Sequence, residues 1–232
     1  MRLVNALKSD ITFQYRQGFY WIYLFLTLIY MVIMTKLPDG SIKAYGVMLV
    51  VFSDPSLIGL FFIGGIVMLE KVQGVIKYLG VTPLASWEYL LSKALSLSLV
   101  SLAAGLAITM ATYSGPVNFG LLIPGIFLTS TFFTLYGFMI SATTRTINQY
   151  LVKVVPYMLL IILPCLSFFM KSDPVIFDLF PSVSGLRLIQ GAFFGMAAGR
   201  VLLDVCFLLL ATGLMFFIAQ RTYSKMLVSE EE

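Results

Sequence analysis

The sequence contains no histidine, and only 11% of its 232 residues carry a charge. Histidine is the side chain that most often acts as a general base or as a transition-metal ligand, so its absence argues against catalytic residues and against a metal site. A typical soluble domain has about 25% charged residues. A chain with so few cannot cover a surface that faces water. Together with an apolar content of 59%, this predicts an integral membrane protein that is not an enzyme.

The sequence also lacks the G-x-x-x-x-G-K-[ST] loop that cradles nucleotide phosphates. If transport depends on ATP, then ATP and Mg²⁺ must bind to a separate polypeptide, and we expect no cofactor on this chain. Cysteine is scarce as well. Cys165 and Cys206 each lie in an apolar run, where we expect small apolar fillers rather than a disulfide.

Long apolar runs dominate what is present. A helix needs about 20 mostly apolar residues to cross a bilayer, and six runs come close to or exceed that length. We therefore expect an all-α fold with six transmembrane helices in one permease domain, residues 1–232. The six expected spans cover residues 19–36, 46–69, 89–112, 119–141, 150–170 and 200–220.

The first 18 residues are more polar, but they repeat apolar side chains with a spacing of four, at Leu3, Leu7, Ile11 and Tyr15. This spacing places the four on one stripe of a helix, which predicts a helix that lies in the membrane interface.

Residues 171–199, before the last span, contain an apolar piece that is too short to cross the bilayer. We expect short re-entrant or surface helices on the outer side here, although a loosely packed outer loop also fits the pattern. Gly191 and Gly195 are separated by four residues, and such glycines permit close helix packing.

The charges predict the orientation of the chain. Ten of the fifteen lysines and arginines fall in the N-terminus, residues 70–93, residues 142–153 and the C-terminus. Cytoplasmic loops carry the excess of Lys and Arg, so both termini are expected in the cytoplasm. Because the charges lie in short connections between apolar runs, we interpret them as orientation signals and expect no nucleic acid partner.

The connection between the second and third spans, EKVQGVIKYLGVTPLASWEYLLSK, begins at Glu70 and ends at Lys93. Apolar residues repeat at helical spacing from Val72 to Leu79, and Gly80 is a plausible helix stop. Thr82-Pro83 then breaks the chain, and Lys93 can extend back to the interface. We predict a short amphipathic helix across the cytoplasmic mouth that can transmit a push from a soluble partner.

At this point the chain resembles the permease subunit of ABC-2-type exporters, which have the type V fold. In that family an acidic residue ends the second span, a glycine follows, and a Leu-x-x-[Thr/Ser]-Pro stretch precedes a basic residue. The stretch FSDPSLIGLFFIGGIVMLEK is most similar to small permeases of the fluoroquinolone and multidrug exporter group. The matching family positions here are Glu70, Gly74, Leu79, Thr82, Pro83 and Lys93.

The resemblance implies that a cytoplasmic helix docks on an ATP-binding cassette ATPase subunit. It also implies two permease copies per transporter, either identical or related, in a prokaryotic plasma membrane. The substrate would be a drug, a lipid or an amphipathic peptide. Family members have short outer helices before the last span that help to form the exit gate, which makes Gly191 and Gly195 candidate gate residues. The residues expected to couple to the ATPase are Glu70, Lys71, Gly74, Tyr78, Leu79, Thr82 and Pro83.

Two alternatives remain open, an ion-coupled secondary transporter and a membrane scaffold or immunity protein that transports nothing. Ion coupling needs ionisable groups near the middle of the bilayer, for which the candidates are Asp54 and Asp204. Asp54-Pro55 would either form a polar kink on the transport path or lie in water before a span that begins near Leu57. Asp204 can pair with Arg200 one turn earlier.

Overall fold

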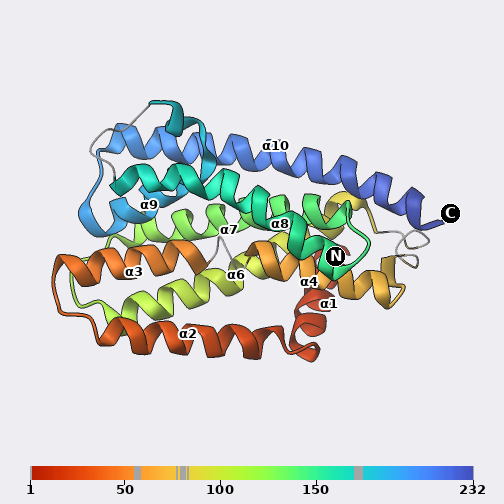
Figure 1. Ribbon diagram of the computed structural model, residues 1–232, viewed down its shortest axis with the longest axis horizontal. Coiled ribbons are helices and arrows are strands. Elements are labelled where there is room, and N and C mark those ends of the chain that lie inside the picture. Colours follow the sequence, from red (N-terminus) through yellow and green to blue (C-terminus); the bar gives the residue numbers. More distant parts are fainter. Residues whose placement is uncertain are drawn as a thin grey trace.

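The computed structural model describes residues 2–54, 59–76, 78, 82, 84–169 and 175–231 of the chain. Every regular element among these residues is helical, and most of the helices run along one long axis (Figure 1). Four segments are long and apolar enough to cross a membrane, and a fifth qualifies if two helices at the N-terminus count as one bent span. The four are Ser86–Thr112 (α6), Phe119–Ala142 (α7), Ile147–Leu166 and Ala198–Leu227. The prediction of an all-α, multi-pass membrane protein is thus confirmed.

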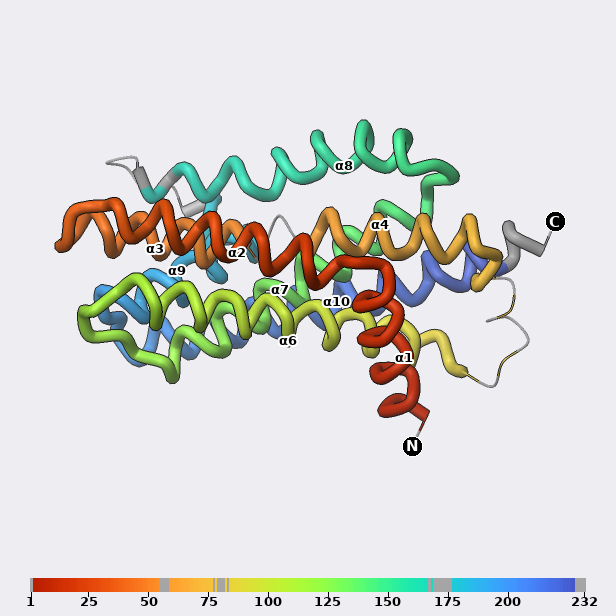
Figure 2. The backbone as a smooth tube through the Cα atoms, turned by 90° about the horizontal axis from the view of Figure 1, so that it is seen from below, coloured from red at the N-terminus to blue at the C-terminus, as the bar shows by residue number. Residues whose placement is uncertain are grey.

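The N-terminal pair consists of α1 (Arg2–Arg16) and α2 (Phe19–Thr35), which meet at an angle of 69°. Gly18 makes this bend with a φ of 81°, a left-handed conformation that glycine adopts readily. In Figure 2, α1 turns away from the bundle axis while α2 follows it. On α1, Ile11 and Tyr15 from the expected stripe are exposed, whereas Asp10 and Gln14 are buried against the protein.

The expected second span, 46–69, is divided between two helices, α3 (Ser41–Ser53) and α4 (Gly59–Val72), on either side of residues 55–58, which lie outside the described residues. The two helices follow one another along the bundle (Figures 1 and 2). Sequence chemistry accounts for the division, because Pro55 has no N–H with which to continue the hydrogen-bond ladder of α3.

The last part of the chain comprises α8 (Ile147–Ile162), the short 3-10 helices η2 (Leu163–Phe169) and η3 (Val175–Leu179), α9 (Pro181–Phe194) and α10 (Ala198–Glu231). Helix α9 buries most of its side chains and packs against α7 and α10. The alternative of a loosely packed loop is therefore wrong for residues 181–194. Helix α10 continues well beyond the expected end of the last span at residue 220.

Two glycines allow close helix approaches in the core. A Cβ atom on Gly64 in α4 would lie 2.0 Å from the Tyr150 ring of α8, and one on Gly137 in α7 would lie 2.8 Å from the backbone oxygen of Leu60. The Tyr150 hydroxyl also donates a hydrogen bond to that oxygen of Leu60, at 2.5 Å. These contacts join α4, α7 and α8 directly.

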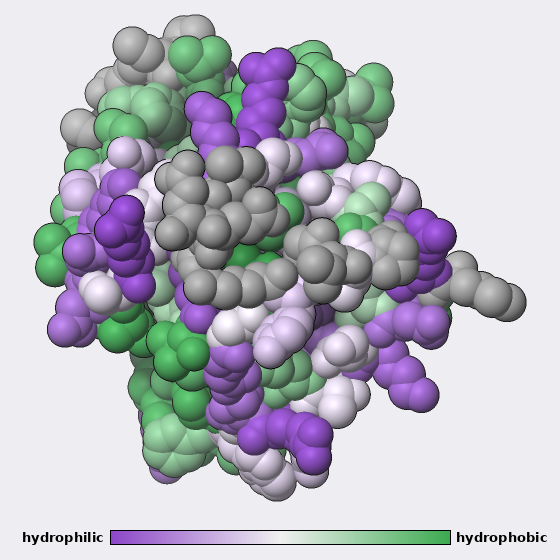
Figure 3. All heavy atoms as spheres, turned by 90° about the vertical axis from the view of Figure 1, so that its right-hand side faces the viewer, coloured by the Kyte–Doolittle hydropathy of each residue, from purple (hydrophilic) through white to green (hydrophobic). Residues whose placement is uncertain are grey.

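Both chain termini lie at one end of the bundle, together with α1, the end of α4 and the start of α8 (Figure 1). Hydrophilic side chains gather over this end (Figure 3). The N-terminus, the end of α4, the start of α8 and the C-terminus belong to the segments that hold ten of the fifteen lysines and arginines of the sequence. The opposite end carries the turn from α2 to α3, the turn from α6 to α7 and the start of α10.

Candidate functional site

The most heavily charged buried site joins α1, α4 and α6 near the end that holds both termini. The ammonium Nζ of Lys93 lies 2.6 Å from Oε1 of Glu70 and 2.8 Å from Oδ1 of Asp10. Lys93 is only 1% exposed, and both carboxylates are buried. Taking three charges out of water is costly unless each is paired and hydrogen-bonded, so this group, which we call the Lys93 cluster, fixes the three helices relative to one another.

Hydroxyl and amide groups complete the cluster. Tyr89 donates to Oε2 of Glu70 at 2.6 Å, and Ser92 donates to Oδ2 of Asp10 at 2.5 Å. One turn further along α1, Nε2 of Gln14 donates to Oγ of Ser96 at 2.7 Å. The second oxygen of each carboxylate thus has its own donor, as a buried charge requires.

The C-terminal half of α10 reaches the same cluster through an aromatic contact. The rings of Tyr89 and Tyr223 stack with their centroids 4.6 Å apart, and Lys93 Nζ lies 4.6 Å from the centroid of Tyr89. Such contacts between a cation and a ring face are favourable, more so when water is excluded. The cluster therefore connects the end of α4 to α1, α6 and α10.

Two of the predicted residues are buried here. The ammonium group of Lys93 is held by two carboxylates between α1, α4 and α6. Glu70 is buried and bonded within the chain. A coupling role for Glu70 would therefore act through the position of the end of α4.

Lys71, the next residue, points to the end of α7. Its Nζ donates to the backbone oxygens of Ser141, Ala142 and Thr144, at 3.3, 3.5 and 2.7 Å. The last carbonyls of a helix have no partner within the helix, and a cation there satisfies them and interacts well with the helix dipole. Lys71 thus fixes α4 to α7, whereas the Lys93 cluster fixes α4 to α6 and α1.

Gly74 ends α4 with a φ of 70°, and its N–H donates to the backbone oxygen of Lys71 at 3.1 Å. The expected apolar stripe starting at Val72 is therefore wrong, since Val72 is 84% exposed whereas Ile76, beyond the glycine, is buried. Tyr78 is helical and 72% exposed.

Three predicted coupling residues follow Tyr78 in the sequence. Thr82 is exposed, whereas Leu79 and Pro83 lie outside the residues that the structure describes.

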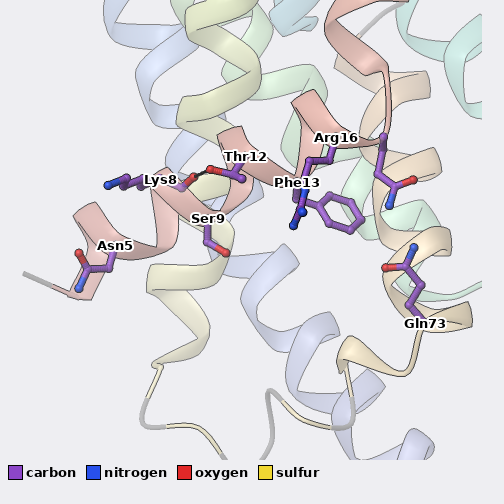
Figure 4. A pocket seen from close by; sticks show the side chains of 8 residues that line it. Asn5, Lys8, Ser9, Thr12, Phe13, Arg16 and Gln73 are labelled. Atoms are coloured by element: carbon purple, nitrogen blue, oxygen red, sulfur yellow. Dashed lines mark hydrogen bonds between the residues drawn. The ribbon is translucent and has the colours of Figure 1, made fainter.

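A surface pocket of about 690 Å³ lies between α1 and Gln73, just before Gly74. Figure 4 shows the side chains of α1 that line it, with Gln73 across from them. Lys8 and Arg16 give the lining two positive charges, and Phe13 contributes an apolar ring. The segment after Gly74 therefore leaves the bundle next to a basic, partly apolar surface.

A second polar group lies inside the bundle at Asp54, directly after α3. Asp54 is 1% exposed. The Tyr23 hydroxyl of α2 donates to its Oδ2 and lies 3.3 Å from Oγ of Ser101 in α6, which accepts from Ser130 of α7 at 3.1 Å. The second oxygen, Oδ1, has no hydrogen-bond partner. Of the two alternatives, Asp54 in water before the span is wrong, and a buried polar group at a helix break is what the structure shows.

Asp204 belongs to a third cluster, which we call the outer cluster because the sequence predicts this segment on the outer side. It joins η3 and α9 to α10 and does not include Asp54. The Asp204 carboxylate accepts from Ser184 at 3.1 Å and lies 3.5 Å from Nη1 of Arg187. The expected pairing with Arg200 is confirmed, with 3.6 Å between Nε and Oδ2. Arg187 and Arg200 both also contact Asp178, so the cluster fixes η3 and α9 to α10.

Asp178, which lies outside the membrane-spanning helices, has a pKa lowered from its ordinary value. Burial by itself raises the pKa of this carboxyl, but the hydrogen bonds and positive charges of Arg200 and Arg187 outweigh that effect.

Gly191 and Gly195, the candidate gate residues, lie in the last turn of α9 and directly after it. A Cβ atom on Gly191 would lie 2.9 Å from Cβ of Met196, and Gly195 has a φ of 81°. Both glycines therefore serve the sharp turn from α9 toward α10.

Comparison with known proteins identifies the family. A model of the fluoroquinolones export permease protein family matches residues 1–231. The chain belongs to this family. It is 32% identical, over 196 residues, to proteins named fluoroquinolones export permease protein from two strains of Mycobacterium tuberculosis, CDC 1551 / Oshkosh and ATCC 25618 / H37Rv. The matched region covers 83% of this chain and 81% of each relative.

Among the cluster residues that escaped the sequence analysis of this family member are Asp10, Tyr23 and Tyr89. Tyr23 and Tyr89 sit near span ends, where amphipathic rings are ordinary, but both are buried and bonded to carboxylates. The sequence did contain a signal for Asp10, because it is the one acidic residue in an otherwise basic helix, α1. Its partner is 83 residues away in the sequence, too far for any local pattern to reveal.

Proposed function

We propose that the chain is the membrane subunit of an ATP-driven exporter and works with a separate nucleotide-binding subunit. Membership of an export permease family supports the transport role, and the sequence offers no phosphate loop of its own. The observation that carries the coupling role is the Lys93 cluster, which fixes the end of α4 at the point where the segment after Gly74 leaves the bundle. ATP and Mg²⁺ would bind to the partner, and no hydrolysis would occur on this chain.

In this proposal the ATPase contacts the segment that carries the exposed Tyr78, beside the basic pocket of Lys8 and Arg16. When the ATPase closes on ATP, it moves this segment and with it the end of α4. Glu70 passes the displacement to α6 and α1 through Lys93 and Asp10, and Lys71 passes it to α7. Packed helices with buried, fully paired charges move as units rather than deform.

The proposed topology has six spans, with the termini in the cytoplasm of a prokaryotic cell and α1 in the membrane interface. The larger share of lysines and arginines in the segments that meet at the end with both termini supports this orientation. A second permease copy, identical or related, would complete the transport path. The proposed spans are α2, α3 with α4, α6, α7, α8 with η2, and α10.

A labelling experiment tests the orientation. In a variant without the two native cysteines, a cysteine at Asp39, between α2 and α3, should react with a membrane-impermeant maleimide from outside the cell. A cysteine at Asn148, near the start of α8, should react only after the membrane is opened. The reverse pattern contradicts the proposed topology.

The substrate class also follows from the family. Its relatives are named for fluoroquinolones, and the apolar interior of this chain suits an amphipathic drug. We take fluoroquinolones as the first candidates, with lipids and amphipathic peptides as alternatives to be tested in the same assay.

Co-purification tests the ATPase partner. Tyr78→Asp places a charge on the exposed coupling segment and should abolish co-purification with the proposed ATPase subunit. Tyr45→Asp is the matched control, because Tyr45 is also exposed but lies on α3, toward the opposite end of the bundle. If Tyr78→Asp and charged replacements of Leu79 bind and stimulate the ATPase normally, the coupling segment is assigned wrongly.

One observation favours a second candidate, an ion-coupled transporter that needs no ATPase. Asp54 is a buried carboxylate inside the bundle, and such groups are common in proton relays of secondary transporters. Transport by the chain alone, driven by a proton gradient and abolished by Asp54→Asn, would support this candidate over the ATP-driven exporter.

A further inference from the structure

Asp54 is the one buried carboxylate among the described residues that has neither a cation nor a backbone N–H as its partner. Asp10 and Glu70 share Lys93, and Asp204 faces Arg187 and Arg200. Glu88 accepts a hydrogen bond from the backbone N–H of Ala85 at 2.9 Å. Asp54 has one donor, the Tyr23 hydroxyl, and its Oδ1 has no partner. Oδ2 of Asp204 also lacks a hydrogen bond, but it lies 3.6 Å from Nε of Arg200.

The groups that face Asp54 bear no positive charge. On α2 they are the phenols Tyr23 and Tyr30, and the chain of hydroxyls continues through Ser101 of α6 to Ser130 of α7. Within the described residues, no lysine or arginine lies within ion-pair distance of Asp54. An ionised carboxylate that is buried without a cation pays a large desolvation cost, so in the empty site the carboxyl should be neutral.

The surroundings are nevertheless suited to an organic cation. The ring of Phe62 from α4 packs edge-on against that of Tyr23, with centroids 5.8 Å apart, and Phe19 packs against Phe62 at 5.4 Å. Tyr23, which bonds to Asp54, thus begins a row of three rings, and an ammonium group interacts favourably with the face of an aromatic ring. The unpartnered Oδ1 is the atom that could receive it.

We propose that Asp54 is a cation-exchange site, which holds a proton when empty and releases it when the ammonium group of an amphipathic amine binds. The O–H bond of the carboxyl breaks, its proton leaves to the solvent, and an ammonium–carboxylate pair takes its place. The site stays neutral overall in both states, as a low-dielectric interior requires. This inference rests on the proposed export of drugs and names the chemical group by which they are recognised.

The test uses the full-length chain, with its ATPase subunit, in lipid nanodiscs. At neutral pH the infrared spectrum of the wild type should contain a carbonyl band of a protonated carboxyl that is absent from Asp54→Asn. Adding norfloxacin, whose piperazine ring bears a protonated amine, should remove this band and release protons into a weakly buffered solution. N-acetylnorfloxacin, which lacks that positive charge, should do neither.

Binding measurements complete the test. The wild type should bind norfloxacin about tenfold or more tightly than the N-acetyl compound, and Asp54→Asn should remove this preference. Tyr23→Phe, which keeps the ring but removes the hydroxyl, should weaken norfloxacin binding with little effect on the N-acetyl compound. Asp39→Asn, at an exposed surface acid, serves as the control and should behave as the wild type does.

The outcomes separate this inference from the function on which it rests. If the wild type binds both compounds equally, lacks the protonated band, or keeps it in the presence of norfloxacin, then Asp54 is not an exchange site but drug export stands. If the wild type binds neither compound, both the exchange site and the proposed fluoroquinolone substrate are contradicted. Asp54→Asn is close in size to the wild type, and its melting temperature shows whether the variant is folded.

Discussion

Lys93 and Glu70 form a buried ion pair, with 2.6 Å between Nζ and Oε1, that joins the first half of α6 to the end of α4. Asp10 from α1 adds a second carboxylate at 2.8 Å. These three residues come from helices that are far apart in the sequence, and their charges meet where the chain leaves the bundle toward its proposed partner.

Replacing Lys93 by Met should lower the free energy of unfolding by about 3–5 kcal/mol, because it leaves two buried carboxylates without a cation. Chemical denaturation in mixed micelles measures this loss. Adding Glu70→Gln and Asp10→Asn to the same chain should recover part of it. Lys43→Met is the control, since Lys43 pairs with an exposed Asp39 and exposed pairs contribute about 0–1 kcal/mol. A Lys93→Met chain as stable as the wild type would show that the cluster does not hold the helices together.

Gly64→Ala should destabilise the chain by about 1–3 kcal/mol through overpacking, because the new methyl group would lie 2.0 Å from the ring of Tyr150. Thermal unfolding detects this loss. Gly213→Ala in α10 is the matched control, as its Cβ would meet nothing within 4 Å. That change should be neutral or slightly stabilising, given the higher helix propensity of alanine. Equal melting temperatures for both variants contradict the close contact of α4 and α8.

Gly74→Ala should weaken the stimulation of the ATPase, whereas Gly74→Asn should weaken it less. The position has a φ of 70° with open space around it, so the cost is backbone strain of about 1–2 kcal/mol, which asparagine tolerates better than alanine. ATPase activity of the reconstituted complex provides the measurement. Gly199→Ala, also in open space but without a positive φ, should leave the activity unchanged. Equal activity of the two Gly74 variants would mean that the turn at the end of α4 does not matter for coupling.

The outer cluster should make stability depend on pH in the acidic range. The pKa of Asp178 is lowered in the folded chain, so its contribution is fully present above the unfolded value, about 3.9. The contribution is lost as the pH falls through the lower folded value. Melting temperatures of the wild type and Asp178→Asn should therefore differ at pH 7 and converge below about pH 4. The same difference at every pH would contradict an ion pair at Asp178.

The sequence predicted much of the fold but less of the site. Apolar runs and basic connections define the helices and the end at which they gather, because hydrophobic length and charge are local properties. Asp54-Pro55 indicated the break in the second span for the same reason. The burial of Lys93 could not be predicted, because nothing near it in the sequence shows that two distant carboxylates compensate its charge. The exposure of Val72 was likewise missed, because the φ of Gly74 resets the helix phase.

Norfloxacin uptake into inside-out proteoliposomes tests the central claim most directly. The chain is reconstituted with the proposed ATPase subunit, with an ATPase variant that cannot hydrolyse ATP, or alone. For an ATP-driven exporter we expect uptake only when the active ATPase and ATP are both present, with no uptake by the chain alone under a proton gradient. Uptake by the chain alone, driven by a proton gradient without ATP, would contradict it.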